Sequence, residues 1–207
     1  MEAGIRRRSR REERKEETRR ELIEAAVKVF AERGFQRASL EEIARDAGYT
    51  TGAIYWHFGG KDELFLAAFE AYSLTRVGEL AEVDGSTRGE LPQRARAFAD
   101  HWMARLADDP SFMVVALEFF VHSLRTPHLR DALATRHAAL RLALAGLLER
   151  EAREAGAELP MPAEQLATVL RELGVGLAIA KLGDPDAVPD SLYGDFVQRV
   201  FELGEGR

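Results

Sequence analysis

The 207-residue chain contains no cysteine, so disulfide bonds and thiolate metal sites are excluded. Long apolar runs are also absent, because the best candidate, 175–180, is far shorter than the roughly 20 residues that span a bilayer. The charged N-terminus is followed by no apolar segment of the kind found in secretory signals. We therefore expect no membrane span and a cytoplasmic location.

An overall excess of positive charge is also absent, since the whole chain has a net charge of −6, and this alone would speak against nucleic-acid binding. The charge is unevenly distributed, however. Residues 1–61 hold 14 Lys+Arg against 11 Asp+Glu, a net of +3, whereas the remainder holds 15 against 24, a net of −9. DNA binding needs only a local cationic face that neutralises phosphates. The asymmetry predicts a basic N-terminal module on an acidic body.

The pattern of apolar residues predicts an all-α fold, because no sustained period-2 alternation and no hairpin signal is present. Helical spacing and stop signals predict helices over 18–33, 39–47, 50–58 and 61–83, and further helices over 91–106, 112–122, 127–147, 163–182 and 190–204. Residues 1–15 form a polar arm that includes the basic run 6–11. This arm is expected to be partly disordered or a frayed extension of the first helix.

A capping box and three glycines delimit a pair of short helices. Ser39-x-x-Glu42 starts the first helix and Gly48 ends it, while Gly59-Gly60 ends the second. Two such helices joined by a tight turn are typical of a helix-turn-helix, in which the second helix lies in the major groove of DNA.

The second short helix has one side for a core and another for a partner. Ile54 and Phe58 lie four residues apart and can anchor it. The rings of Tyr55-Trp56-His57 cannot all face inward, so at least one is exposed. Gly52 costs roughly 1 kcal/mol relative to alanine inside a helix. Two explanations account for a glycine at this position: close approach of the helix to a sugar-phosphate backbone, or a fraying first turn. Thr50 and Lys61 likewise fit an N-cap and an ordinary surface lysine, or phosphate contacts at helix N-termini.

The segments 39–48, 50–58 and 61–65 together resemble the DNA-binding module of the tetracycline-repressor (TetR) family. The string Gly-Ala-Ile-Tyr-Trp-His-Phe at 52–58 is most similar to the multidrug-efflux repressors of that family. The resemblance covers about 19–71 and implies an all-helical homodimer that binds operator double-stranded DNA and a small-molecule inducer. It implies DNA contacts, mainly to phosphates, from Ser39, Thr50, Thr51, Gly52, Tyr55, Trp56, His57 and Lys61. Many relatives have Lys or Arg in place of Thr51, so the operator sequence is left open.

The three parts expected from these patterns are a basic flexible arm over 1–15, a helix-turn-helix DNA-binding domain over 16–71 and a ligand-binding and dimerisation domain over 72–207. Polar groups among aromatic side chains are what a small-molecule pocket needs. The candidate ligand-binding residues are Phe98, His101, Trp102, Met113, Glu118, Phe119, His122 and His137. A core histidine or a surface carboxylate is the alternative for each polar group among them.

We predict a DNA-binding regulator, a repressor that a small hydrophobic or amphipathic ligand releases from its operator by favouring a second dimer geometry. The alternative is a ligand-independent or protein-partnered regulator with the same fold. An enzyme is not expected, since no nucleophile elbow, phosphate-binding glycine loop or metal-binding HExxH helix is present, and no metal or cofactor is expected. Dimerisation is predicted through the last two helices and their apolar residues Leu166, Leu173, Leu177, Phe196, Val200 and Phe201.

Overall fold

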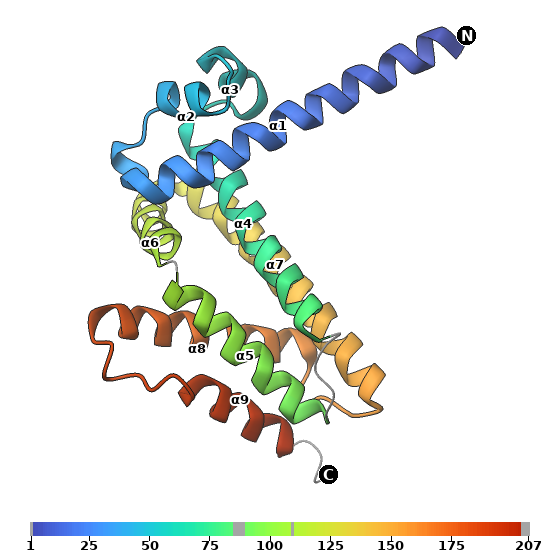
Figure 1. Cartoon of the computed structure of the whole chain (residues 1–207), viewed down its shortest axis with the longest axis vertical. Helices are drawn as coiled ribbons and strands as arrows, with labels where there is room; N and C mark the ends of the chain where they lie inside the picture. The colour runs from blue at the N-terminus through green and yellow to red at the C-terminus, as the bar shows by residue number, and fades with distance from the viewer. Residues whose placement is uncertain (1, 85–89, 109, 204–207) are drawn as a thin grey trace. The chain divides into compact units, whose positions relative to one another are not determined.

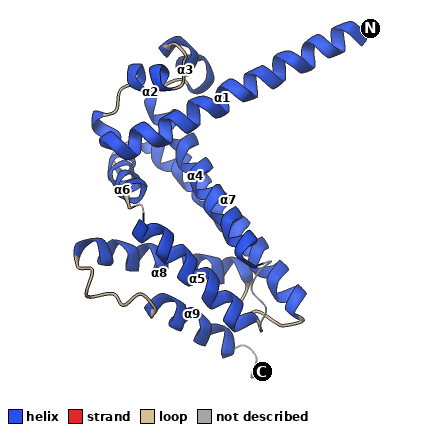
Figure 2. Cartoon of the chain, in the orientation of Figure 1, coloured by secondary structure: helices blue, strands red, loops and turns tan. Residues whose placement is uncertain are grey.

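The computed structural model describes residues 2–84, 90–108 and 110–203. Within these ranges the chain is helical and contains no strand, which confirms the all-α prediction (Figure 1, Figure 2). The helices are α1 (Glu2–Arg37), α2 (Leu40–Asp46), α3 (Thr51–Phe58), α4 (Lys61–Asp84), α5 (Leu91–Asp108), α6 (Ser111–Leu124), α7 (Pro127–Ala155), α8 (Ala163–Gly183) and α9 (Leu192–Glu202). Among the described residues, no helix has both the length and the apolar character needed to cross a membrane.

The helix boundaries in the N-terminal part follow from local signals. Ser39 Oγ accepts a hydrogen bond from the Glu42 amide at 3.1 Å, and the Glu42 carboxylate accepts one from the Ser39 amide at 3.2 Å. The capping box is therefore formed as predicted. α1 begins at Glu2, so the backbone of the arm continues the first helix. The side chains of residues 1–10, and with them most of the basic run 6–11, lie outside the described part.

The chain folds into two compact units. The first contains Met1–Tyr72 and Ser111–Leu133, and the second contains Ser73–Pro110 and Ala134–Arg207. α6 therefore belongs with the N-terminal helices, and a single boundary at residue 71 does not describe the folded chain. The functions predicted for 1–15, 16–71 and 72–207 stay predictions.

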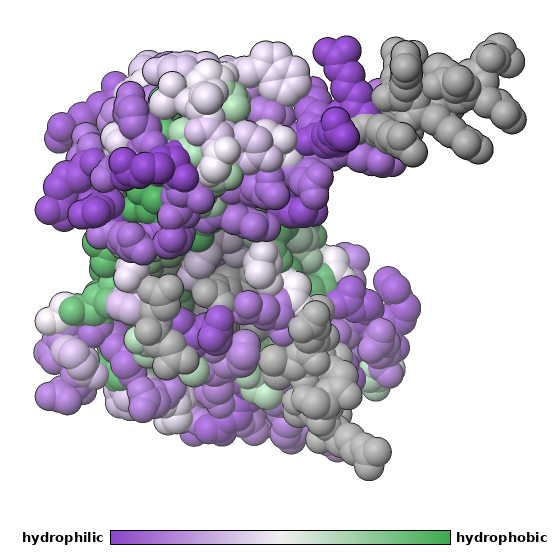
Figure 3. Space-filling view, turned by 45° about the horizontal axis from the view of Figure 1, so that its top comes forward, coloured by the Kyte–Doolittle hydropathy of each residue, from purple (hydrophilic) through white to green (hydrophobic). Residues whose placement is uncertain are grey.

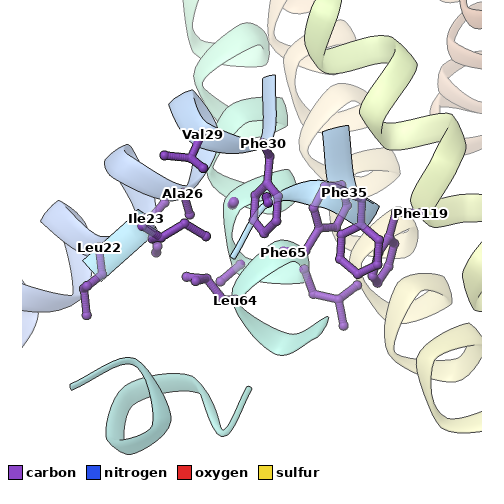
Figure 4. Packing of buried hydrophobic residues seen from close by; sticks show 14 of the residues in the cluster. Leu22, Ile23, Ala26, Val29, Phe30, Phe35, Leu64, Phe65 and Phe119 are labelled. Carbon is purple, nitrogen blue, oxygen red and sulfur yellow. The ribbon is translucent and has the colours of Figure 1, made fainter. Parts of the chain in front are cut away.

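The core of the first unit joins α1, α4 and α6 through aromatic rings (Figure 4). The ring of Phe65 lies 5.1 Å from that of Phe30 and 4.3 Å from that of Phe119, measured between centroids. Phe35 completes the group, edge-on to Phe119 at 5.0 Å. All four side chains are buried, and the edge-to-face and stacked geometries are those that aromatic pairs favour. This cluster fixes the helices against which the helix-turn-helix packs.

The core of the second unit depends on close approach of α5 to α8 and α9, which lie side by side in Figure 1. A Cβ atom at Gly174 would lie only 2.6 Å from the Trp102 ring, so this position in α8 admits no side chain without rearrangement. The Tyr193 hydroxyl donates to the Leu170 carbonyl at 2.9 Å and joins α9 to α8. The packing is therefore between helices of one chain.

The predicted dimer face on α8 and α9 needs correction. Leu166 and Phe201 are buried within this core, and Leu173, Leu177 and Val200 pack against it. Of the six predicted residues only Phe196 is exposed, and its exposed fraction is 41%. The apolar residues that α8, α9 and the residue after α9 leave exposed are Val169, Ile179, Leu182, Leu192, Phe196 and Leu203.

Candidate nucleic-acid interface

α3 has a buried side and an exposed side, as predicted. Ile54 is completely buried in the core of the first unit, and Phe58 packs partly buried against the same core. The next two residues face away, with 59% of Tyr55 and 65% of Trp56 exposed. Two adjacent exposed aromatic side chains on a short, anchored helix form a surface suited to a partner rather than to the protein's own core.

The turn between α2 and α3 is fixed to α1 by side chains. The Tyr49 hydroxyl donates to the Glu21 carboxylate and accepts from Thr18 Oγ1 at 3.3 Å, and the bond to Glu21 raises the pKa of Tyr49. Lys28 Nζ lies 2.6 Å from Asp46 Oδ1 at the end of α2. These contacts determine the direction in which α3 leaves the turn. The role of Tyr49 was not predicted from the sequence, because its partners lie about 30 residues away.

The first turn of α3 leaves polar groups available to a partner. Thr50 occupies the N-cap position, yet its side chain makes no capping hydrogen bond. Gly52 is exposed, and a Cβ atom there would meet only the Thr50 hydroxyl, at 3.6 Å. Packing within the chain therefore does not require glycine at this position. The DNA contacts predicted for Thr50 and Gly52 therefore remain compatible with the structure. The same holds for Thr51, which is half-buried.

Two basic residues of α1, Lys15 and Arg19, lie beside α3, and the sequence did not predict this proximity. Lys15 Nζ lies 5.3 Å from the centroid of the Trp56 ring, and the Arg19 guanidinium lies at the same distance from Phe58. Burial, and then the charges of Lys15 and Arg19, lower the pKa of His57 and favour its neutral form. The available signal was periodicity: Lys15 and Arg19 lie four residues apart, in line with the buried Leu22 and Ala26.

The remaining two predicted contact residues, Ser39 and Lys61, stand at the starts of α2 and α4. Ser39 caps α2 with its hydroxyl. Lys61, the first residue of α4, donates from Nζ to the Gln36 carbonyl at 3.2 Å and lies 4.8 Å from the Phe35 ring centroid. Burial lowers its pKa. We call Thr50, Thr51, Gly52, Tyr55, Trp56, His57, Lys61, Ser39, Lys15 and Arg19 the candidate DNA-binding face.

The eight candidate ligand-binding residues are not gathered in one unit. Met113, Glu118, Phe119 and His122 belong to α6 in the first unit, whereas Phe98, His101, Trp102 and His137 belong to the second. The structure has a groove at the α7–α8 turn, and none of the eight residues lines it. Its lining residues are Glu149, Ala152, Arg153, Ala157, Glu158, Leu159, Met161, Pro162 and Ala163. The ligand assignment stays a prediction.

Several of these eight side chains already have contacts within the chain. Trp102 is packed against Gly174, and Phe119 is buried in the core of the first unit. Glu118 accepts a hydrogen bond from the Phe35 amide at 2.9 Å. His101 has a buried ring nitrogen, Nε2, for which the described residues provide no hydrogen-bond partner, and burial lowers the pKa of His137. The described residues contain no group of three or more His, Asp or Glu that could hold a metal ion.

Comparison with known families agrees with this arrangement. Residues 22–68 match the model of the bacterial regulatory proteins of the tetR family, and residues 92–201 match the C-terminal part of the BetI-type transcriptional repressors. The chain therefore belongs to the tetR family of regulatory proteins, with a C-terminal part of the BetI type.

Individual relatives support the family over shorter stretches. The chain is 54% identical over 52 residues to the transcriptional regulator SrpR of Pseudomonas putida. This stretch covers 25% of this chain and 24% of that protein. It is 45% identical over 65 residues to AcrR of Shigella flexneri, 31% of this chain and 30% of that one. The chain thus matches only about a quarter to a third of the length of these curated relatives.

Solved structures extend the similarity of fold to nearly the whole chain. A transcriptional regulator from Pseudomonas aeruginosa PAO1 is 25% identical, with a TM-score of 0.66 over 92% of this chain and 91% of that one. The regulator FadR from Bacillus subtilis, solved in complex with stearoyl-CoA, is 17% identical, with a TM-score of 0.63 over 90% of this chain and 98% of that one. At 17% identity, the similarity to FadR shows that the fold is shared and nothing more.

Proposed function

We propose that this protein is a cytoplasmic DNA-binding transcriptional repressor that a small hydrophobic or amphipathic ligand releases from its operator. The observation that carries the proposal is the arrangement of α3, in which Ile54 is fully buried, Tyr55 and Trp56 are exposed, and Lys15 of α1 lies over the Trp56 ring. α3 presents rings and hydroxyls, and α1 places cations beside them, as binding to a DNA groove and its phosphates requires.

Selection from a random double-stranded DNA pool tests the DNA-binding part. The full-length protein should enrich one sequence, which we call the selected operator, and should bind it far more tightly than a scrambled duplex at one stated salt concentration. The enriched sequence should have two related half-sites, since a symmetric dimer places two copies of α3 on the DNA. Equal binding to both duplexes would contradict the proposal.

The proposal that a ligand releases the protein from DNA rests on the family and on α4. This single helix begins in the first unit and ends in the second. A ligand that binds better to a geometry that does not fit the operator shifts the population and releases DNA. Stearoyl-CoA, the ligand named for a structure of the same fold, is a suitable first probe, followed by other long-chain amphiphiles. If none of them changes operator affinity or melting temperature, the ligand-independent alternative is favoured.

We further propose that the protein is a homodimer through the exposed apolar residues of α8 and α9. Replacing Phe196 by glutamate should shift the dimer to monomer at micromolar concentration, because it puts a charge into an apolar contact. Sedimentation equilibrium measures the shift. Phe120→Glu on α6 is the matched control, since Phe120 is 42% exposed and Phe196 is 41% exposed. A wild-type protein that is only monomeric, or a monomer caused by Phe120→Glu alone, would rule out this interface.

Deletion of residues 1–15 should weaken binding to the selected operator and to random DNA alike, because the arm contributes cations without sequence information. The plot of log affinity against log salt concentration should become flatter by about 0.9 for each phosphate that the shortened protein no longer neutralises. Arg20→Ala is the control, since Arg20 lies on the same helix, about 140° around from Lys15, and pairs with Glu17 and Glu24. An unchanged salt slope after the deletion would show that the arm does not contact DNA.

A further inference from the structure

The bend at the end of α1 is closed by a carboxylate from a distant helix. Gly34 interrupts the helix with φ 77° and ψ 163°, so the amide of Phe35 begins a new turn without the usual acceptor four residues earlier. The Glu118 carboxylate of α6 accepts from that amide at 2.9 Å. The positive φ favours glycine at position 34, and a Cβ atom there would lie 3.1 Å from both Glu118 carboxylate oxygens and press on the carboxylate.

The same bend holds Lys61. Its ammonium donates to the carbonyl of Gln36 at 3.2 Å and lies 4.8 Å from the centroid of the Phe35 ring. Lys61 is therefore held by Phe35, whose amide is bound by Glu118, and by Gln36. A shift of the bend would move both groups that fix the lysine side chain.

α6 makes a second polar contact one turn further on. His122 Nε2 lies 3.6 Å from Asp62 Oδ1, and Asp62 is the neighbour of Lys61 at the start of α4. Between the two polar contacts, Phe119 packs on Phe35 and Phe65 (Figure 4). α6 thus contacts both segments that determine where the lysine lies: the bend of α1 and the first turn of α4.

We infer that Glu118 is a positioning residue for DNA binding, which acts by holding the 34–36 bend and, through it, the Lys61 ammonium. The inference rests on the proposed function, because it takes Lys61 as a phosphate contact. It gives Glu118 a role within the chain that is separate from the ligand contact predicted from the sequence, which stays a prediction. The hydrogen bond is charge-assisted and therefore stronger than one between neutral groups. Its loss leaves the Phe35 amide without an acceptor and frees the bend to move.

Two substitutions in the full-length protein distinguish the effect of the length of the Glu118 side chain from the effect of its charge. Glu118→Gln keeps the length and a carbonyl acceptor, whereas Glu118→Asp keeps the charge but is one methylene shorter. Affinity for the selected operator should be nearly retained in Glu118→Gln and weakened roughly 2- to 30-fold in Glu118→Asp and Glu118→Ala, the range for residues that act on a distant site. Glu149→Ala, at an exposed glutamate of α7, is the control and should bind as wild type.

A double-mutant cycle tests whether Glu118 acts through Lys61. Affinities are measured for Glu118→Ala, Lys61→Ala and the double variant, each over a series of salt concentrations. If Glu118 positions the ammonium, the double variant should bind no more weakly than Lys61→Ala, and Glu118→Ala should lower the salt slope toward that of Lys61→Ala. Should Glu118→Ala fail to fold, the same cycle is run with Glu118→Asp.

The outcomes are distinguishable. A lowered melting temperature with unchanged operator affinity and salt slope would make Glu118 merely structural and overturn the inference. Additive losses in the cycle would also overturn it, because Glu118 would then act independently of Lys61. In both cases the wild-type protein still binds its selected operator, so the proposed function stands. A wild type that enriches no DNA sequence would overturn both.

Discussion

Replacing Ile54 by alanine should destabilise the first unit by about 2–5 kcal/mol, the range for truncating a buried aliphatic side chain. Ile54 is fully buried in the same cluster as Leu22 of α1 and Ile43 of α2. Its side chain is the only one in α3 that is buried to this degree. The truncation therefore removes the main anchor of the helix and leaves a cavity where α3 meets the other two.

Thermal and urea unfolding measure this loss. For a chain of this size, each kcal/mol should lower the melting temperature by roughly 2–4 °C. Leu142→Ala is the control, since Leu142 is 54% exposed on α7 and its truncation should change stability by no more than about 0.5 kcal/mol. A variant at Ile54 as stable as wild type would mean that α3 is not held by this core, and the division of the helix into two sides would be wrong.

The N-terminal helices could be predicted in detail because their signals are local. The hydrogen bonds of the Ser39–Glu42 capping box span three residues, and the stops at Gly48 and Gly59 depend on glycines with φ of 75° and 86°. Such signals are fixed by the conformational preferences of the residues themselves. The buried side of α3 was predictable for the same reason, since one turn of helix separates Ile54 from Phe58.

The surroundings of α6 could not be predicted, because periodicity shows which residues share a face but not what covers that face. Glu118 and Phe119 fitted a ligand pocket by composition. The structure also brings Glu118 to Phe35, 83 residues earlier in the chain, a contact that no local pattern indicates. Likewise, Leu166 and Phe201 have the spacing of a dimer interface but are covered by helices of their own chain. A contact within a chain and one between chains leave the same apolar pattern in a helix.

Exposed residues that serve a partner are also weakly marked in the sequence. On the side of the molecule drawn in Figure 3, most of the described surface is hydrophilic. Lys15 and Arg19 stand among acidic neighbours in a charged segment, and only the structure shows that they lie against Trp56 and Phe58. Tests of the DNA-binding face therefore have to separate its exposed side chains from those that hold the fold.

Tyr55→Ala should weaken binding to the selected operator by about 1–3 kcal/mol, the range for removing one positioned contact to nucleic acid. The melting temperature should change little, because 59% of the side chain is exposed and its truncation leaves no cavity in the core. Operator affinity and melting temperature are measured on the same preparation, at one stated salt concentration, since affinity for DNA depends steeply on salt.

The comparison of Tyr55→Ala with Ile54→Ala separates binding from folding, because the two residues are neighbours on one helix and differ in burial. The variant at Ile54 should lose stability, whereas the variant at Tyr55 should lose affinity and keep its stability. Tyr55→Phe divides the second effect further: it retains the ring, so full affinity would assign the contact to the ring and a loss would assign it to the hydroxyl. If Tyr55→Ala binds the operator as tightly as wild type, or unfolds as Ile54→Ala does, the exposed side of α3 is not the side that faces DNA.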